Sequence, residues 1–141
     1  MGGARSGGAW IPVAALLGLY LVSSALFYPG VITVTDEASY IRDARIVLTG
    51  QAGIPITDPF SDRVIVIEPS ARYPLGTAIL MAPFVALADW RGAYVTPLLC
   101  VVLGVLATML WLRAAGKSPL FAAIVLAYPA TLVMGRVAMS D

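Results

Sequence analysis

The feature of the sequence that most restricts its fold is a set of four long segments without any charged side chain. Asp, Glu, Lys and Arg are all absent from residues 6–35, 73–88, 92–112 and 118–135. The hydrocarbon core of a bilayer is about 30 Å thick, and a helix needs about 20 residues to cross it. Only 12% of the residues are charged, which is about half the share usual in soluble domains. The sequence therefore predicts an all-α membrane protein.

Three apolar runs are predicted to be transmembrane helices, at residues 10–28, 94–112 and 118–135. Aromatic residues stand at both ends of the first two runs, as expected where helix ends meet the membrane–water interface. A cleaved signal peptide is the alternative for the first run, because Arg5 precedes it and residues 23–25 (SSA) resemble a cleavage site. The length of this run and the apolar runs that follow favour a retained helix.

The third run carries its own start and kink signals. Ser118 suits the N-cap of a helix, and Pro119 suits the first helical position. Pro129 lacks the N–H that an uninterrupted helix requires at its position. We therefore expect this helix to begin at Ser118 and to bend at Pro129.

The remaining charge-free segment, residues 73–88 (YPLGTAILMAPFVALA), is short for a membrane span. At sixteen residues with two prolines, an interfacial or re-entrant helix competes with a true span. Arg113 and Lys117 flank a short loop, which the positive-inside rule places in the cytoplasm together with residues 1–9. Residues 1–9 and the loop between Arg113 and Lys117 can both be cytoplasmic only if residues 73–88 do not cross the membrane. We therefore expect a surface helix over residues 74–88.

The predicted topology is that of a multi-pass protein of the plasma (inner) membrane. A flexible cytoplasmic terminus (1–9) precedes the first span, and an external loop (29–93) follows it. A cytoplasmic loop (113–117) joins the second and third spans, and residues 136–141 begin a second external or periplasmic loop. The five arginines of the first loop oppose an external location, but loops longer than about sixty residues are weak orientation signals.

Within the external loop, residues 36–49 are predicted to form an amphipathic helix along the membrane surface. Gly50 supplies a stop signal, and Arg42, Asp43 and Arg45 are expected on the polar side. The apolar positions recur at helical spacing; they are Tyr40, Ile41, Ala44, Val47 and Leu48.

Two adjacent acids, Asp36 and Glu37, open this helix. Neighbouring helical residues point about 100° apart, so one acid can face a cavity while the other faces the helix or solvent. The alternative is an ordinary structural role, because acids in a first turn cap free N–H groups and favour the helix dipole. After this helix, residues 51–72 are rich in proline and short polar residues. Their VIVI sequence (64–67) predicts either one short strand or a patch that dips into the membrane.

The residue inventory excludes several kinds of chemistry. The chain has no histidine, which removes Ser-His-Asp and Cys-His catalysis and imidazole metal ligands. Its one cysteine, Cys100, lies within an apolar run, and we interpret it as a small packing residue. The net charge of +1 gives no electrostatic basis for binding nucleic acid. Any catalysis must therefore use carboxylates, arginines, hydroxyls and bound ions.

Three segments together resemble the start of a known family. They are TDEASYIRDARIVLTG (35–50), EPSARYPLGTAILMAPFVAL (68–87) and GRVAMSD (135–141). Their order resembles that of the protein O-mannosyltransferase and aminoarabinose-transferase group, glycosyltransferases of the C superfamily. Members show an Asp-Glu pair after the first span and a surface helix that ends near glycine. A Pro-x-Gly motif opens a second surface helix, and an arginine followed by aspartate five residues later comes after the third span.

The resemblance implies an enzyme that moves a sugar from a polyprenyl-phosphate donor to a lipid, glycan or protein acceptor on the outer face. It implies that Asp36 is the catalytic base and Glu37 its neighbour in the acidic motif. Arg136 and Asp141 correspond to the second motif, and Asp141 is a candidate ligand for a divalent metal. Arg72 stands where many members carry lysine or histidine, and it becomes a candidate for contact with the donor phosphate.

Such a reaction needs no histidine. A lipid phosphate is a good leaving group, so one carboxylate that accepts the acceptor's proton and one cation beside the phosphate suffice for a single inverting displacement. Glycosidases need a second carboxyl group because their leaving group is poorer. Arginine suits the phosphate because it can form two parallel hydrogen bonds to it.

The alternative is a small non-enzymatic membrane protein or a transporter fragment, whose outer acids are solvated caps or ion ligands. An intramembrane charge would favour an ion route, and the predicted spans contain none. Family members continue through many more spans, so we expect this chain to be an amino-terminal fragment that is inactive alone. The reading frame beyond Asp141 separates the two interpretations: further hydrophobic segments favour the transferase, and a stop codon favours the small protein.

Overall fold

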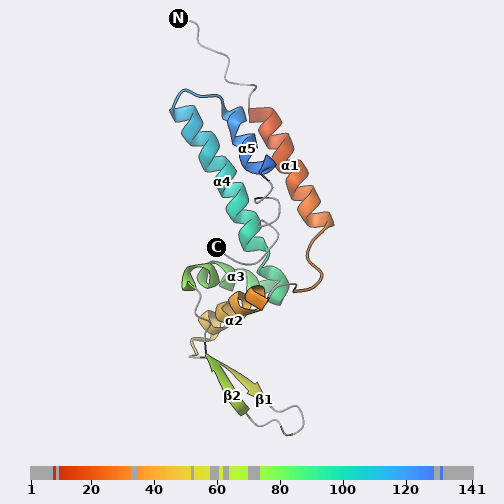
Figure 1. Ribbon diagram of the computed structural model, residues 1–141, viewed down its shortest axis with the longest axis vertical. Coiled ribbons are helices and arrows are strands. Elements are labelled where there is room, and N and C mark those ends of the chain that lie inside the picture. Colours follow the sequence, from red (N-terminus) through yellow and green to blue (C-terminus); the bar gives the residue numbers. More distant parts are fainter. Residues whose placement is uncertain are drawn as a thin grey trace, which may run out of the picture. The chain divides into compact units, whose positions relative to one another are not determined.

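The computed structural model describes part of the chain: residues 8, 10–32, 35–51, 53–57, 61, 64–69, 74–128 and 131. These residues are predominantly helical, which agrees with the all-α part of the prediction (Figure 1). The chain divides into two compact units. The first unit contains residues 1–28 and 97–136, and the second contains residues 29–96 and 137–141.

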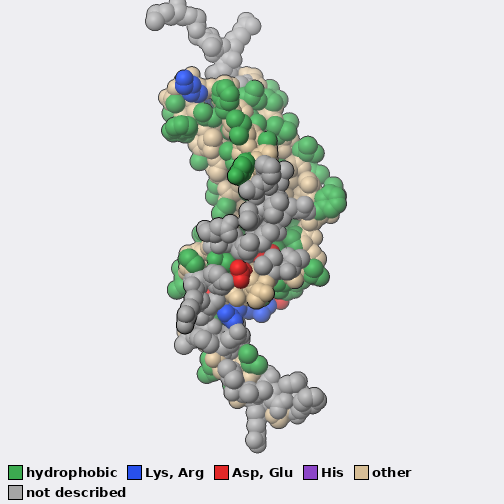
Figure 2. All heavy atoms as spheres, in the orientation of Figure 1, with side chains coloured by type: hydrophobic (Ala, Val, Ile, Leu, Met, Phe, Trp, Pro, Cys, Tyr) green, Lys and Arg blue, Asp and Glu red, His purple; other side chains and the backbone are tan. Residues whose placement is uncertain are grey.

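The first unit is built on two apolar helices, α1 (Trp10–Leu26) and α4 (Val95–Ala114), of which α4 starts in the second unit. Among the described residues, α4 is the one helix long and apolar enough to cross a membrane, with 20 residues and a mean hydropathy of 2.3. Helix α1 contains no charged residue but has only 17 residues, near the lower limit for a span. Figure 2 shows hydrophobic side chains over much of the visible surface of this unit.

The inner side of the first unit is a small apolar core. It contains Val13, Tyr20, Val105, Leu112, Ala122 and Leu126. The outer side is also apolar, since Leu103, Leu110 and Trp111 are each more than 60% exposed. A helix that is apolar on all sides belongs in a protein core or in lipid.

The start predicted for the third apolar run is confirmed. The backbone N–H of Leu120 donates to Oγ of Ser118 at 3.3 Å, and Pro119 occupies the first helical position. The helix that follows differs from the expected 118–135 span. It consists of a 3₁₀ turn, η1 (Pro119–Ala122), and a short helix, α5 (Ala123–Ala127). Tyr128 is extended, with ψ 122°, as the residue before a proline prefers; the kink predicted at Pro129 lies outside the described residues.

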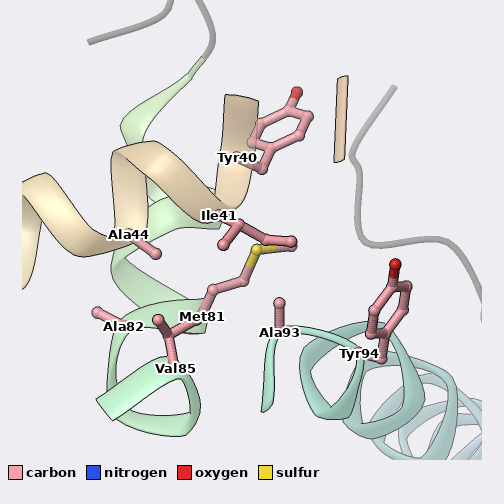
Figure 3. Packing of buried hydrophobic residues seen from close by; sticks show 8 residues of the cluster. All are labelled: Tyr40, Ile41, Ala44, Met81, Ala82, Val85, Ala93 and Tyr94. Carbon is pink, nitrogen blue, oxygen red and sulfur yellow. The ribbon is translucent and has the colours of Figure 1, made fainter. Parts of the chain in front are cut away.

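The second unit contains the acid-bearing helix α2 (Thr35–Thr49) and helix α3 (Leu75–Gly92), which pack against each other. Helix α2 matches the range predicted from spacing. The predicted stop is also present, because Gly50 has φ +65° and its N–H donates to the carbonyl of Ile46 at 2.9 Å. The core between the helices is shown in Figure 3; it contains Tyr40, Ile41, Ala44, Met81, Ala82, Val85, Ala93 and Tyr94.

A two-stranded antiparallel hairpin joins α2 to α3. Strand β2 (Val64–Pro69) includes the VIVI sequence, for which a strand was one of two expectations. Its partner, β1 (Gly53–Thr57), was not predicted because its sequence GIPIT contains Pro55. Proline cannot donate to a ladder. In a hairpin of two strands each strand keeps an open edge, so the missing N–H of Pro55 is tolerated opposite Ile67.

Helix α3 extends beyond the expected end at residue 88 by way of a sharp kink. Ala88 and Asp89 leave helical geometry, and Asp89 adopts φ 51° and ψ −146°. A Cβ added to Gly92 would lie 1.9 Å from the carbonyl oxygen of Phe84. The backbone of Gly92 therefore approaches the body of α3 so closely that only glycine fits.

Candidate functional site

The two acids at the start of α2 occupy different environments. Glu37 is 1% exposed, whereas Asp36 is partly exposed. This separation follows from helix geometry, because adjacent residues point about 100° apart. Glu37 lies four residues before Ile41 and seven before Ala44, on the face of α2 that forms the core. The pair therefore consists of one enclosed carboxylate and one that water can reach.

The enclosed carboxylate is held by a tyrosine from a distant part of the chain. The hydroxyl of Tyr94 donates to Oε2 of Glu37 at 3.2 Å, and Tyr94 itself is 3% exposed. A buried carboxylate is costly unless hydrogen bonds compensate for lost water. In Figure 3 the hydroxyl groups of Tyr40 and Tyr94 both point away from Met81, which fills the centre of the apolar cluster. The polar atoms thus gather along one border of that cluster.

Tyr94 is itself fixed by its neighbours. The ring of Trp90 meets it edge to face, with centroids 6.3 Å apart. The guanidinium of Arg91 lies over the Trp90 ring, 5.1 Å from its centroid. Because the tight turn between α3 and α4 places these side chains together, the position of Glu37 depends on the geometry of that turn.

A second acid of α2 is also enclosed, contrary to expectation. Asp43 was predicted on the polar side of the helix, but it is 1% exposed. The Nε atom of Arg42 lies 3.9 Å from its Oδ1. Asp43 follows Asp36 by seven residues and Tyr40 by three, so these three positions form one stripe of the helix. That spacing was the sequence signal for its burial.

An ion pair that sequence reasoning missed links α2 to the kink of α3. Arg45 donates from Nη2 to Oδ1 of Asp89, and both side chains are largely exposed. An exposed pair of this kind contributes little stability, typically about 0–1 kcal/mol. The pair links α2 to the kink, where Asp89 has a positive φ that is uncommon for residues other than glycine.

The other predicted site residues, Arg72, Arg136 and Asp141, lie outside the described residues, so their relation to Asp36 and Glu37 stays a prediction. Within the described ranges, no group of three or more His, Cys, Asp or Glu side chains is placed to hold a metal ion. The polar groups described around α2 are carboxylates, tyrosine hydroxyls and arginines, and such groups are suited to proton transfer and to contact with anions.

No protein-family model, curated protein or solved structure matches this chain. The fold and the site therefore define only a class: a predominantly helical chain with an apolar helical unit and a second unit that holds acids at the start of one helix.

Proposed function

We propose that this chain belongs to an integral-membrane glycosyltransferase. It transfers a sugar, with inversion, from a polyprenyl-phosphate donor to an acceptor on the outer face of the membrane. The observation that supports this most is the division of the two acids, with Glu37 enclosed and held by Tyr94 and Asp36 left accessible. The ordered resemblance of residues 35–141 to C-superfamily glycosyltransferases supplies the reaction type.

In this proposal Asp36 is the general base. Its carboxylate accepts the proton of the acceptor group, and the acceptor atom attacks the anomeric carbon of the donor sugar. The bond between that carbon and the lipid phosphate breaks, and its electron pair leaves with the phosphate. Arg72 and Arg136 are the proposed cations beside the departing phosphate. The reaction is balanced without a metal, and we assign no step to one.

Glu37 has a different role in this account. A carboxylate that is 1% exposed and accepts a hydrogen bond from Tyr94 cannot reach an acceptor without breaking its contacts. It acts as a positioning residue, because it fixes the first turn of α2 against the turn before α4.

The proposed topology has α1, α4 and the run that begins at η1 crossing the plasma membrane. Residues 1–9 and the loop 113–117 are cytoplasmic, and the second unit is external. The long apolar tail of the donor explains why the acids belong to a unit that directly precedes a membrane-spanning helix, since the tail can remain in lipid while its phosphate reaches the surface.

The direct test of the reaction type uses the complete protein, purified and supplied with a polyprenyl-phosphate sugar labelled in the sugar. The anomeric configuration of the product is read by NMR. We expect transfer to an external acceptor with the opposite anomeric configuration to the donor. A product that retains the configuration would contradict the single-displacement mechanism, and a protein that transfers no sugar from any such donor would contradict the proposed class.

A further inference from the structure

Three arginines lie among the described residues of the second unit, and their surroundings differ. Arg42 and Arg45 each lie beside the carboxylate of an aspartate. The guanidinium of Arg91 lies over the ring of Trp90, 5.1 Å from its centroid. An aromatic ring attracts a cation through its quadrupole but carries no net charge. The contact with Trp90 therefore holds the side chain of Arg91 in place without neutralising it.

The stacked position of Arg91 suits an anionic ligand. Arg91 is exposed, so a ligand can approach its guanidinium from outside the unit. A guanidinium can donate two parallel hydrogen bonds to the oxygens of one phosphate. Stacking on a ring also restricts the long side chain before any ligand arrives, so less conformational entropy is lost on binding.

A series of contacts connects Arg91 to the acids of α2. The ring of Trp90 meets the ring of Tyr94 edge to face, with centroids 6.3 Å apart. The hydroxyl of Tyr94 in turn donates to the carboxylate of Glu37, the neighbour of Asp36 in the first turn of α2. The turn that carries the two rings packs closely on the body of α3. Two fixed aromatic rings therefore separate the guanidinium of Arg91 from the enclosed acid.

This separation fits the geometry of an inverting displacement. The base and the leaving group then lie on opposite faces of the sugar, and in inverting glycosidases the two carboxyl groups are about 6.5–9.5 Å apart. A cation that serves the departing phosphate must therefore lie beyond the sugar and not in contact with the base. An arginine held two rings away from the acid pair meets this requirement.

We propose that the guanidinium of Arg91 binds the phosphate of the polyprenyl-phosphate donor. The phosphate gains one negative charge when its bond to the anomeric carbon breaks, so a cation fixed beforehand stabilises the departing group more than the bound donor. Arg91 is a described residue, unlike Arg72 and Arg136, and it adds a third cation to those two. Trp90 is the positioning residue that holds the guanidinium. The inference rests on the proposed function, because that function supplies the ligand.

The test is calorimetric titration of the complete protein in detergent micelles with farnesyl phosphate, a prenyl phosphate with a short tail. Arg91→Gln removes the cation, and Arg91→Lys keeps the charge without the two parallel hydrogen bonds. Arg113→Gln is the matched control, because Arg113 is also exposed and lies at the end of α4 in the first unit. Farnesol, which has the same tail and no phosphate, serves as the second ligand.

We expect Arg91→Gln to raise the Kd for farnesyl phosphate by about 10- to 100-fold, the usual effect of losing hydrogen bonds to a charged group. Arg91→Lys should raise this Kd by a smaller factor, and Arg113→Gln should leave it unchanged. The Kd for farnesol should be the same in all variants, because the expected loss involves only the phosphate.

An unchanged Kd for farnesyl phosphate in Arg91→Gln would overturn the proposal, and Arg91 would then only complement the dipole at the end of α3. An equal loss of farnesol binding in both Arg91 variants would show a structural role and would also overturn it. Equal competition by dioctanoylphosphatidylglycerol would show that Arg91 binds lipid head groups in general, against its assignment to the donor. A parent protein that binds no farnesyl phosphate would contradict the proposed function itself, so the two failures are distinguishable.

Discussion

The hydroxyl of Tyr94 donates a hydrogen bond to the carboxylate of Glu37, 57 residues earlier in the chain, at 3.2 Å. This contact joins the first turn of the acid-bearing helix α2 to the residue just before α4. Its consequence is that the two adjacent acids of α2 are not equivalent, because one is fixed inside the unit and the other remains accessible.

The first prediction concerns this hydrogen bond. Tyr94→Phe removes the donor while keeping the ring, and it leaves a buried carboxylate with one partner fewer. We expect the free energy of unfolding to fall by about 1–3 kcal/mol, the usual cost of such a loss. The measurement is denaturant unfolding of the purified protein in detergent.

The matched control for Tyr94 is Tyr128→Phe, since Tyr128 is 61% exposed. We expect this change to alter stability by less than about 0.5 kcal/mol. A double-mutant cycle of Tyr94→Phe with Glu37→Gln isolates the pair. Equal effects of the two tyrosine changes, with no coupling in the cycle, would show that the hydrogen bond contributes nothing.

The second prediction concerns the close approach of Gly92 to α3. In Gly92→Ala the new Cβ would lie 1.9 Å from the Phe84 carbonyl oxygen, so the turn before α4 must shift. We expect a loss of about 1–3 kcal/mol, as for other overpacked sites. Gly76→Ala is the matched control within the same helix, because nothing lies within 4 Å of its added Cβ.

Gly76→Ala should leave the stability of the protein unchanged or raise it by up to about 1 kcal/mol, since alanine favours helix more than glycine does and Gly76 lies in the first turn of α3. Thermal unfolding of both variants provides the comparison. If Gly92→Ala melts no lower than the parent protein, the turn does not pass as close to Phe84 as described.

The third prediction concerns the kink at Asp89, whose φ of 51° is disfavoured for most side chains. Asp89→Val should destabilise the protein by about 1–3 kcal/mol, because β-branched residues tolerate positive φ poorly. Asp89→Asn should cost less than about 1 kcal/mol. Asparagine has nearly the same shape and backbone preferences as aspartate, so the main loss is the exposed ion pair with Arg45. Similar melting temperatures for the two variants would argue against the kinked backbone.

The fourth prediction concerns membrane topology. Single cysteines at Ala38, Arg91 and Lys117, in a Cys100→Ala background, are treated with a membrane-impermeant thiol reagent on intact cells. We expect labelling at positions 38 and 91 and protection at 117 until the cells are permeabilised. Gly92 is unsuitable as a labelling site because it admits no side chain. Labelling at 117 together with protection at 91 would show that α3 crosses the membrane.

The local features of this fold, such as helix starts and stops, were predicted well from the sequence. The range of α2 followed from the spacing of Tyr40, Ile41 and Ala44 and from the stop at Gly50, and the start of η1 followed from Ser118 and Pro119. These features depend on residues close together in the chain, whose physical effects are the same in most contexts.

The features that escaped prediction depend on distant parts of the chain. The burial of Glu37 could be predicted from its spacing, because it lies four residues before Ile41 on the same face of α2. Its hydrogen bond to Tyr94 could not, because it depends on where the chain turns after α3. The pair of Arg45 with Asp89 likewise required the kink. Strand β1 was not predicted because it contains Pro55, and proline argues against a strand unless the strand has an edge that is not paired.

The central claim is that Asp36 is a catalytic base, and the most direct measurement is the rate of sugar transfer by the complete protein carrying Asp36→Asn. Asparagine keeps an oxygen that can accept hydrogen bonds from the first turn of α2, so the protein should melt close to the parent temperature. Asp36→Ser keeps a hydroxyl for the same purpose, and Asp89→Asn serves as the control that removes an exposed carboxylate elsewhere in the unit.

We expect both Asp36 variants to fold normally and to lose about a hundred- to ten-thousand-fold in rate, the usual contribution of a general base, while Asp89→Asn transfers sugar at nearly the parental rate. A folded Asp36→Asn protein that transfers sugar at the parental rate would contradict the account, and Asp36 would then be a structural residue of the helix start.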